Sequence, residues 1–234
     1  MPAECTKQLD MAPHAVDDLY NGCREKALKK FIDPSVLGKE LNHSKEFQTA
    51  WGKQACDKLM PGKMKEHSSA LNAYFHGGEK FIETLNHDVM TLGGNRSTYE
   101  KEFHFKSFHF LLVDSMTMAS RNDCKIVYAL VTGKKYSGKK GSKVRLGHFT
   151  MAHPTIKDLD VDLVDEQLLN ITTCFFADMG PNVCLKKKAS LLSPSEVFTL
   201  EDIQEVKDED HDYSMIFLKH FQVKTLHNCY AFSR

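Results

Sequence analysis

The hydrophobic pattern of this 234-residue chain changes its period near residue 120, and this change limits the possible folds more than any other feature. Before residue 120, apolar residues recur at the three- and four-residue spacing of amphipathic helices. After it, short apolar runs alternate with loops rich in glycine, proline and charge, as β-strands do. Helices followed by strands predict an α+β fold rather than an alternating βαβ order.

Four helical segments are expected in the first half of the chain. Apolar residues at helical spacing mark each one, and Pro13 and Ser44 stand where helices can begin. Two adjacent glycines, Gly77 and Gly78, are expected to break the third segment. The four segments are 15–30, 44–55, 65–92 and 97–118.

The strongest helical signal covers residues 97–118. Ser97 and Glu100 form a capping-box pattern, in which the serine accepts a hydrogen bond from the amide three residues on and the glutamate reaches back. The residues after Phe108 are nearly all apolar. A helix that is apolar on every side has to be surrounded by protein, so we expect this one at the centre of the fold.

The second half of the chain is expected to be mainly β-structure. Short runs rich in β-branched and aromatic residues are separated by segments with glycine, proline and charge. Three of these segments, 133–141, 153–166 and 201–212, are expected to be loops. The expected strands are 125–131, 143–151, 168–176, 189–192, 196–200, 213–218 and 225–232.

Seven cysteines lie far apart in the sequence, and none belongs to a CxxC pair, so zinc ribbons and thioredoxin-type sites are not indicated. Wide spacing is typical of long-range disulfides formed in an oxidising compartment. The odd number leaves at least one thiol without a partner in the chain. The alternative is that all seven are buried free cysteines. They are Cys5, Cys23, Cys56, Cys124, Cys174, Cys184 and Cys229.

Three N-glycosylation sequons begin at Asn42, Asn95 and Asn170, and together they favour secretion. The chain has no apolar signal core in its first ten residues, no hydrophobic tail for a lipid anchor and no apolar run near the roughly 20 residues of a membrane helix. These features alone indicate a cytosolic protein, but a mature domain with a new initiator methionine would look the same. We expect a secreted or extracellular protein whose signal peptide and any lipid anchor lie outside this sequence.

Charge and local motifs identify no reaction by themselves. Lys and Arg number 31 and Asp and Glu number 31, so net charge gives no general attraction to nucleic acid or membranes. The basic segment 133–145 has no P-loop order and is expected to be a solvated hairpin tip. The acidic run 158–166 lacks the glycine and terminal glutamate of an EF-hand. His104 and His109 are five residues apart on the expected central helix, which is wrong for two ligands on one face, so no metal site is expected.

Several segments, taken in order, resemble the vertebrate ecto-mono-ADP-ribosyltransferases over about residues 9–232, nearly the whole chain. Any one of these segments is a weak signal, whereas all of them in the same order and spacing are a strong one. The segments are 10–23, 99–112, Cys124 with Val127-Tyr128, 144–150, Thr173-Cys174, 191–198 and 228–230.

The resemblance implies a single domain over 1–234, with 9–120 mainly helical and 121–232 mainly β. In that family a helical N-terminal part packs on two antiparallel sheets, which form a cleft for NAD. The resemblance also implies two disulfides, Cys23–Cys229 and Cys124–Cys174, each of which contributes roughly 2–5 kcal/mol. Three cysteines fall outside this pattern: Cys5, Cys56 and Cys184.

The family's chemistry uses three features that this sequence lacks. An arginine that holds the NAD phosphates follows a Val-Tyr pair, where this chain has Ala129. A Ser-x-Ser that positions the nicotinamide ribose is matched by Met151 and His153. A Glu-x-Glu, whose second glutamate stabilises the positive charge as nicotinamide leaves, is matched by Lys187 and Ala189. An alanine cannot supply these charges and a lysine opposes them, so the resemblance implies a catalytically degenerate member.

Three functions remain in competition. The first is a non-enzymatic protein with this fold, which binds an unknown small molecule or extracellular protein through a remodelled cleft and needs no cofactor. The second is an altered NAD-dependent transferase or NAD glycohydrolase, for which NAD is the co-substrate. The third is a surface-interaction protein with a vestigial cleft, for which 133–145 is the candidate surface. The expected cleft residues are Tyr128, Ala129, Arg145, Phe149, Met151, His153, Lys187 and Ala189.

Overall fold

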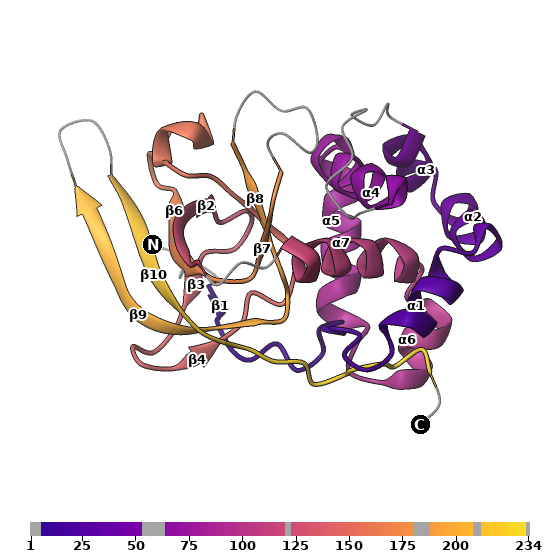
Figure 1. Ribbon diagram of the computed structural model, residues 1–234. Helices are drawn as coiled ribbons and strands as arrows, with labels where there is room; N and C mark the ends of the chain where they lie inside the picture. Colours follow the sequence, from indigo (N-terminus) through magenta and orange to yellow (C-terminus); the bar gives the residue numbers. More distant parts are fainter. Residues whose placement is uncertain (1–5, 53–63, 120–122, 180–187, 208–211, 233–234) are drawn as a thin grey trace.

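The computed structural model describes residues 6–52, 64–119, 123–179, 188–207 and 212–232. Its helices gather on one side and its strands on the other, as Figure 1 shows, in the order that the change of hydrophobic period predicts. The helices are α1 (Arg24–Phe31), α2 (Pro34–His43), α3 (Lys45–Gly52), α4 (Lys65–His76), α5 (Glu79–Thr91), α6 (Arg96–Glu102) and α7 (Lys106–Ala119), and a short 3-10 turn covers Ile156–Leu159.

The strands form two principal sheets and one short pair, which confirms the α+β class. The five-stranded sheet has the order β2-β6-β10-β9-β4, the three-stranded sheet has β5-β8-β7, and β1 pairs with β3. Within the five-stranded sheet β6 and β10 are parallel, which the expectation of purely antiparallel sheets did not include. The strands are β1 (Lys7–Gln8), β2 (Lys125–Leu130), β3 (Tyr136–Ser137), β4 (Lys143–Val144), β5 (Thr150–Ala152), β6 (Gln167–Thr173), β7 (Phe176–Asp178), β8 (Ser190–Leu192), β9 (Glu196–Lys207) and β10 (Asp212–Val223).

Two apolar clusters hold these layers together. One lies between the helices and the three-stranded sheet, where Phe108 and Leu111 of α7 share a core with Leu191 of β8. The other lies between the two sheets, where Ala129 of β2 and Leu192 of β8 share a core with Ile216 of β10. The three-stranded sheet is therefore covered on both faces, and α7 occupies the central, buried place expected for it.

The expected helix over 97–118 is two helices rather than one. α6 ends at Glu102, and α7 begins at Lys106 after an extended link in which Phe103 and Phe105 are buried. Glu40 of α2 explains the new start, because its two carboxylate oxygens accept hydrogen bonds from the Lys106 and Ser107 amides, each at 3.0 Å. A distant carboxylate thus caps α7 and replaces a capping residue in the local sequence.

The predicted N-cap of α6, Ser97, is wrong by two residues. The N-cap is Asn95, whose Oδ1 accepts from the amides of Ser97 and Thr98 at 2.8 and 3.3 Å. The Ser44 prediction is confirmed, since its Oγ accepts from the Phe47 amide at 3.1 Å, and the break predicted at the glycine pair separates α4 from α5.

The helix predicted over 15–30 begins only at Arg24. Tyr20 and Gly22 have positive φ angles of 57° and 83°, which no α-helix tolerates. The apolar residues before them are buried all the same, because Val16 donates its amide to Val89 of α5 and the chain packs as an irregular segment. Tertiary contacts therefore override the helical spacing here.

Three strand predictions and one loop prediction differ from the structure. The segment 143–151 divides into β4 and β5, which belong to different sheets, because Gly147 turns the chain with φ of 75°. The segment 168–176 likewise divides between β6 and β7. The expected loop 201–212 is instead the continuation of β9 and the start of β10, and the expected strand 225–232 forms turns.

Both disulfides implied by the resemblance are confirmed. Cys23 is bonded to Cys229, 206 residues later, and Cys124 is bonded to Cys174. The first link fastens the end of the chain to the start of α1, and the second joins the beginning of β2 to the end of β6. The other cysteines, Cys5, Cys56 and Cys184, lie outside the described residues.

His109 and His104, both predicted on the central helix, lie in different environments. His109 is fully buried on α7, where the Tyr20 hydroxyl donates to Nδ1 and Nε2–H donates to the Val16 carbonyl, both at 2.9 Å. Burial lowers its pKa to about 4, so the ring is neutral at physiological pH. His104 lies in the link between α6 and α7 rather than on a helix, and its ring stacks on His43 with 3.7 Å between centroids.

Glu40 gives the fold a testable pH dependence. Burial raises its pKa from 4.5 to about 7, so the folded state favours the protonated acid and loses stability as the pH rises from 4.5 through 7. Replacing it with glutamine should remove this pH-dependent contribution to the free energy of unfolding. The unfolding free energy of Glu40→Gln minus that of the native chain should therefore change by about 2 kcal/mol between pH 5 and pH 8. Urea unfolding at both pH values measures it.

The free energies of unfolding of the variant and the native chain have to be compared at each pH, because His109 changes the stability of both with pH in the opposite direction. Its lowered pKa destabilises the folded state as the pH falls below 6.5, and it affects both proteins equally. Glu83→Gln, on the exposed face of α5, is the matched control. Parallel pH profiles for native protein and Glu40→Gln would show that Glu40 is not the titrating group.

Candidate functional site

Two of the expected cleft positions, Tyr128 and His153, meet where the two principal sheets touch. Tyr128 of β2 and His153, next to β5, form a bridge in which each amide donates to the other carbonyl, at 2.8 and 2.7 Å. Ala129 follows Tyr128 on β2, and Met151 of β5 precedes His153 by two residues, so both lie near this bridge along the chain. Their side chains, however, do not all face one space.

Tyr128 and Ala129 point to opposite faces of β2, because successive strand residues alternate. Ala129 is fully buried between the two sheets, in the cluster that also contains Ala152 and Leu192. Tyr128 is half-buried and lies on the outer face of the five-stranded sheet. A ligand between the sheets would therefore meet the methyl group of Ala129 and not the ring of Tyr128.

Phe149, Met151 and Ala189 lie on the helical side of the three-stranded sheet. Phe149 is fully buried, and its carbonyl accepts hydrogen bonds from the Tyr74 hydroxyl and the Asn86 amide at 3.0 and 3.1 Å. Ala189 is 3% exposed, and its methyl group belongs to the same apolar cluster. Lys187 lies outside the described residues.

The side chain of Arg145 binds other residues of the protein. Its guanidinium is fully buried and forms an ion pair with Asp17, which is also fully buried. The same group donates to the carbonyls of Met11 at 2.6 Å, Ala12 at 2.9 Å and Lys224 at 3.3 Å. All of its nitrogens thus have protein partners, so its geometry does not support the role expected for it in the cleft.

Lys125 is a charged residue next to the sheet junction that is not predicted from the sequence as part of the site. Lys125 of β2 forms an ion pair with Asp178 of β7, and its ammonium donates to the Ser190 hydroxyl at 2.6 Å. The ammonium also lies 3.9 Å from the centroid of the Phe176 ring. The period of two along β2 places Lys125 on the same face as Ala129, which is the signal that would have identified it.

Glu196 has no free oxygen for catalysis. Its carboxylate is fully buried and accepts from the Thr173 hydroxyl at 2.6 Å, the Cys174 amide at 2.8 Å and His220 Nδ1 at 2.7 Å. The ligand atoms of Cys174, Glu196 and His220 lie within 4.8 Å of one another, but the sulfur belongs to a disulfide and cannot bind a metal as a thiolate. Glu196 therefore joins β6, β9 and β10 as a structural group.

The basic segment 133–145 is not a free hairpin tip. β3 at one end pairs with β1, and β4 at the other pairs with β9. Between them the Gly141 amide donates to the Leu200 carbonyl at 2.7 Å, so the segment is fastened to the five-stranded sheet. Its cationic side chains are mostly exposed, and Lys140 approaches Asp202 at 3.6 Å.

Two surface hollows lie away from the sheet junction. One has a volume of about 210 Å³, and its lining includes Lys7, His14, Met90 and Arg145. The other has a volume of about 360 Å³ and lies at the start of α5, beside the ion pair of Lys80 with Glu46. Neither hollow is lined by residues of β2, β5 or β8.

The model of one protein family, described as NAD:arginine ADP-ribosyltransferase, matches residues 9–225. The chain belongs to this family. The match covers the helices and both principal sheets, so it includes the sheet junction described above.

Similar proteins carry names from the same family. Human ecto-ADP-ribosyltransferase 5 is 29% identical over 206 residues, which cover 81% of this chain and 70% of that protein. The mouse protein of the same name is 30% identical over 216 residues, with 81% and 66% covered. Mouse T-cell ecto-ADP-ribosyltransferase 1 is 31% identical over 150 residues, with 60% and 48% covered. The chain thus spans between about half and 70% of the length of these relatives.

The fold agrees with a solved member of the family. The crystal structure of the eukaryotic mono-ADP-ribosyltransferase ART2.2 superposes with a TM-score of 0.75 at 25% identity, covering 95% of this chain and 98% of that one. A variant of ART2.2 in which a glutamate is replaced with alanine, solved in complex with NADH, superposes with a TM-score of 0.73. Within the described residues, no helix has the length and apolar character needed to cross a bilayer.

Removing the Arg145 side chain should reveal its structural role. Arg145→Met leaves the Asp17 carboxylate buried without its partner, so we expect a loss of about 3–5 kcal/mol of unfolding free energy, measured by urea denaturation. The double variant Asp17→Asn with Arg145→Met should recover part of this loss. Lys140→Met, which removes an exposed ion pair, is the control and should change stability by less than about 1 kcal/mol. Unchanged stability combined with loss of ligand binding would restore Arg145 to the cleft.

Proposed function

We propose that this chain is an extracellular member of the family that binds a ligand or partner without transferring ADP-ribose to arginine. The observation that carries the proposal is the environment of Ala129 and Ala189. Both methyl groups lie in apolar clusters, at the positions where the family's chemistry uses a guanidinium and a carboxylate. Two methyl groups in water-free surroundings supply neither a phosphate contact nor a counter-charge for the departing nicotinamide.

The size of the expected loss supports this proposal over an altered enzyme. Removing one electrostatic group that acts in a transition state typically costs 10²–10³ in rate, or about 3–4 kcal/mol. The guanidinium and the carboxylate are both missing, and the described residues near the junction offer Asp178, which is already paired with Lys125. The sequence between Leu185 and Leu192 contains no carboxylate at all.

Loss of turnover does not require loss of nucleotide binding. A glutamate-to-alanine variant of ART2.2 was solved in complex with NADH, and a glutamate-to-isoleucine variant in complex with NAD. A nicotinamide nucleotide is therefore one candidate ligand for this chain, alongside an unknown small molecule or an extracellular protein. Binding and turnover have to be measured separately.

The second candidate is an NAD-dependent transferase or NAD glycohydrolase with an altered site. The family match over residues 9–225 favours it, because it spans both sheets and the helices. In this case NAD is the co-substrate, and residues outside the three family positions supply the charge stabilisation. Lys125 and Ser190 at the sheet junction are the first residues to examine.

An extracellular location is part of the proposal. Two disulfides are stable in an oxidising compartment, and the relatives are named as ecto-enzymes. Asn42, Asn95 and Asn170 are the candidate glycosylation sites. The third hypothesis, a surface-interaction protein, uses the exposed lysines of 133–145 and would leave the sheet junction without a ligand.

Nicotinamide release from NAD separates the two leading candidates. We expect purified protein to release nicotinamide at least about 10³-fold more slowly than an active relative assayed in parallel, because two electrostatic groups are missing. Calorimetry with NAD measures binding on the same sample. Turnover near that of the relative, lost in Lys125→Ala and kept in Ile126→Ala on the outer face of the same strand, would establish the enzyme instead.

A further inference from the structure

Asn170 lies at the middle of strand β6 with an aromatic residue of the neighbouring strand directly on each side. In the pairing of β6 with β2, Asn170 is opposite Tyr128, and in the pairing of β6 with β10, it is opposite Phe217. Directly opposed residues point to the same face, with Cβ atoms about 4.5–5.5 Å apart. Tyr128, Asn170 and Phe217 therefore form a row across three neighbouring strands.

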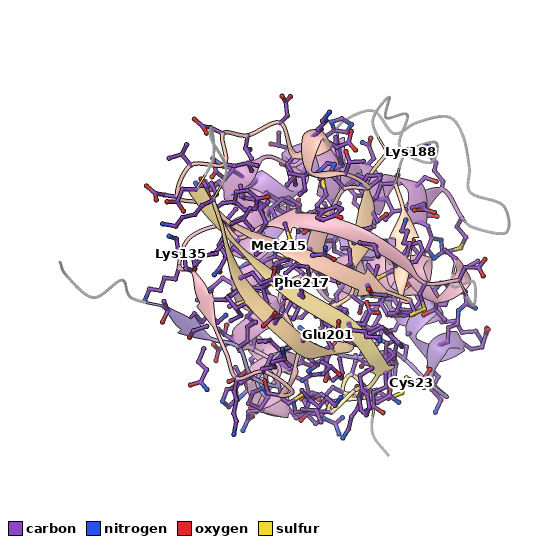
Figure 2. All side chains as sticks on the ribbon, turned by 90° about the vertical axis from the view of Figure 1, so that its left-hand side faces the viewer. Cys23, Lys135, Lys188, Glu201, Met215 and Phe217 are labelled. Carbon is purple, nitrogen blue, oxygen red and sulfur yellow. A yellow bond between two sulfur atoms is a disulfide. The ribbon has the colours of Figure 1, made fainter. Side chains whose placement is uncertain are left out.

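This row faces outward. The neighbours of Asn170 along β6, Leu169 and Ile171, are 2% and 0% exposed and belong to the core between the sheets. Asn170 and Thr172 alternate with them and are half-buried on the other face. Figure 2 views the sheet from that face, with Phe217 and Met215 labelled on it.

The outer face is apolar beside Asn170. Ile126, two residues before Tyr128 on β2, is 56% exposed, and both aromatic residues of the row are half-buried. Asparagine is depleted in strands, so its presence in the middle of β6 needs a reason. Among the described residues, its Nδ2 contacts only a weak acceptor, the Sδ of Met215 at 4.0 Å.

We propose that Asn170 carries an N-linked glycan whose first N-acetylglucosamine packs between Tyr128 and Phe217. Asn170 and Thr172 are the first and third residues of an Asn-Ile-Thr sequon, and the extended strand puts both side chains on this face. Such a sugar has one face of C–H groups, which packs on aromatic rings, and polar groups that remain in water. The glycan thereby covers an apolar patch that would otherwise be exposed.

The other two sequons lie in different surroundings. Asn95 is exposed, and its Oδ1 caps α6 through the amides of Ser97 and Thr98. Asn42 is exposed near the end of α2, and the hydroxyl of its sequon, Ser44, caps α3. Neither asparagine sits in a strand between two paired aromatic residues. A glycan at either position is expected to extend into solvent with little effect on stability.

Secretion from vertebrate cells behind a leader peptide tests the modification itself. Enzymatic deglycosylation in heavy-oxygen water converts each modified asparagine to labelled aspartate, which peptide mass spectrometry counts. We expect label at Asn170 in most of the secreted protein and none in Thr172→Val, which keeps a β-branched strand residue. Secreted protein that is unlabelled at Asn170 would overturn the proposal.

Packing of the first sugar is tested on protein that has already folded, so failure to fold does not interfere. Trimming the glycan to a single N-acetylglucosamine should leave the melting temperature unchanged, whereas complete removal should lower it by about 2 °C, the shift expected for a modest contact in a chain of this size. In Phe217→Leu or Tyr128→Leu, which keep apolar bulk without the ring, that decrease should largely disappear.

Phe221→Leu is the matched control, because Phe221 is an exposed ring on the same strand, away from Asn170. Its response to deglycosylation should equal that of the native chain, and Asn42→Gln should leave the response unchanged as well. An equal temperature shift in the Phe217, Tyr128 and Phe221 variants would show that the sugar does not pack on the row. None of these outcomes depends on whether the cleft binds or cleaves NAD.

Discussion

The buried ion pair between Asp17 and Arg145 is the interaction on which the arrangement of the chain ends depends. In addition to its ion pair with the guanidinium, Asp17 accepts hydrogen bonds from the amides of Leu226 and His227 at 2.7 and 3.0 Å. Arg145 donates to carbonyls of the N-terminal segment. Asp18 continues the network through the amides of Cys229 and Tyr230, and burial raises its pKa to about 6. Charges buried this deeply are stable only when every polar atom has a partner, so this network holds both ends in one arrangement.

The same network explains which parts of the fold the sequence predicts. Helix breaks and caps set by neighbouring residues, such as the glycine pair between α4 and α5 or Ser44 before α3, are predicted well because their partners are local. The segment before Arg24 and the turns after β10 are mispredicted because their hydrogen-bond partners are about 200 residues away in the sequence. The charged arms of β9 and β10 resemble a loop because they pair with each other beyond the core, so no apolar alternation marks them.

For the candidate site, too, the sequence predicts some features and not others. The resemblance implies strand positions for the cleft, and two of them, Tyr128 and His153, form a backbone bridge at the sheet junction. The direction of each side chain depends on strand alternation and on distant partners. Alternation separates Tyr128 from Ala129, and the buried ion pair with Asp17 fixes the direction of the Arg145 guanidinium. Within the part of the chain that the structure describes, the junction has an apolar interior, and Lys125, Asp178 and Ser190 form a polar group at its side.

The bond between Cys23 and Cys229 has a mechanical consequence. It closes residues 23–229 into a covalent ring, and the segments before and after these positions lie outside it as tails. A pulling force applied to the two ends of this domain, as when a cell-surface protein is held between its attachment point and a partner, would pass through the tails and this single bond. The helices and sheets inside the ring would carry almost none of the load and would stay folded until a reductant opened it.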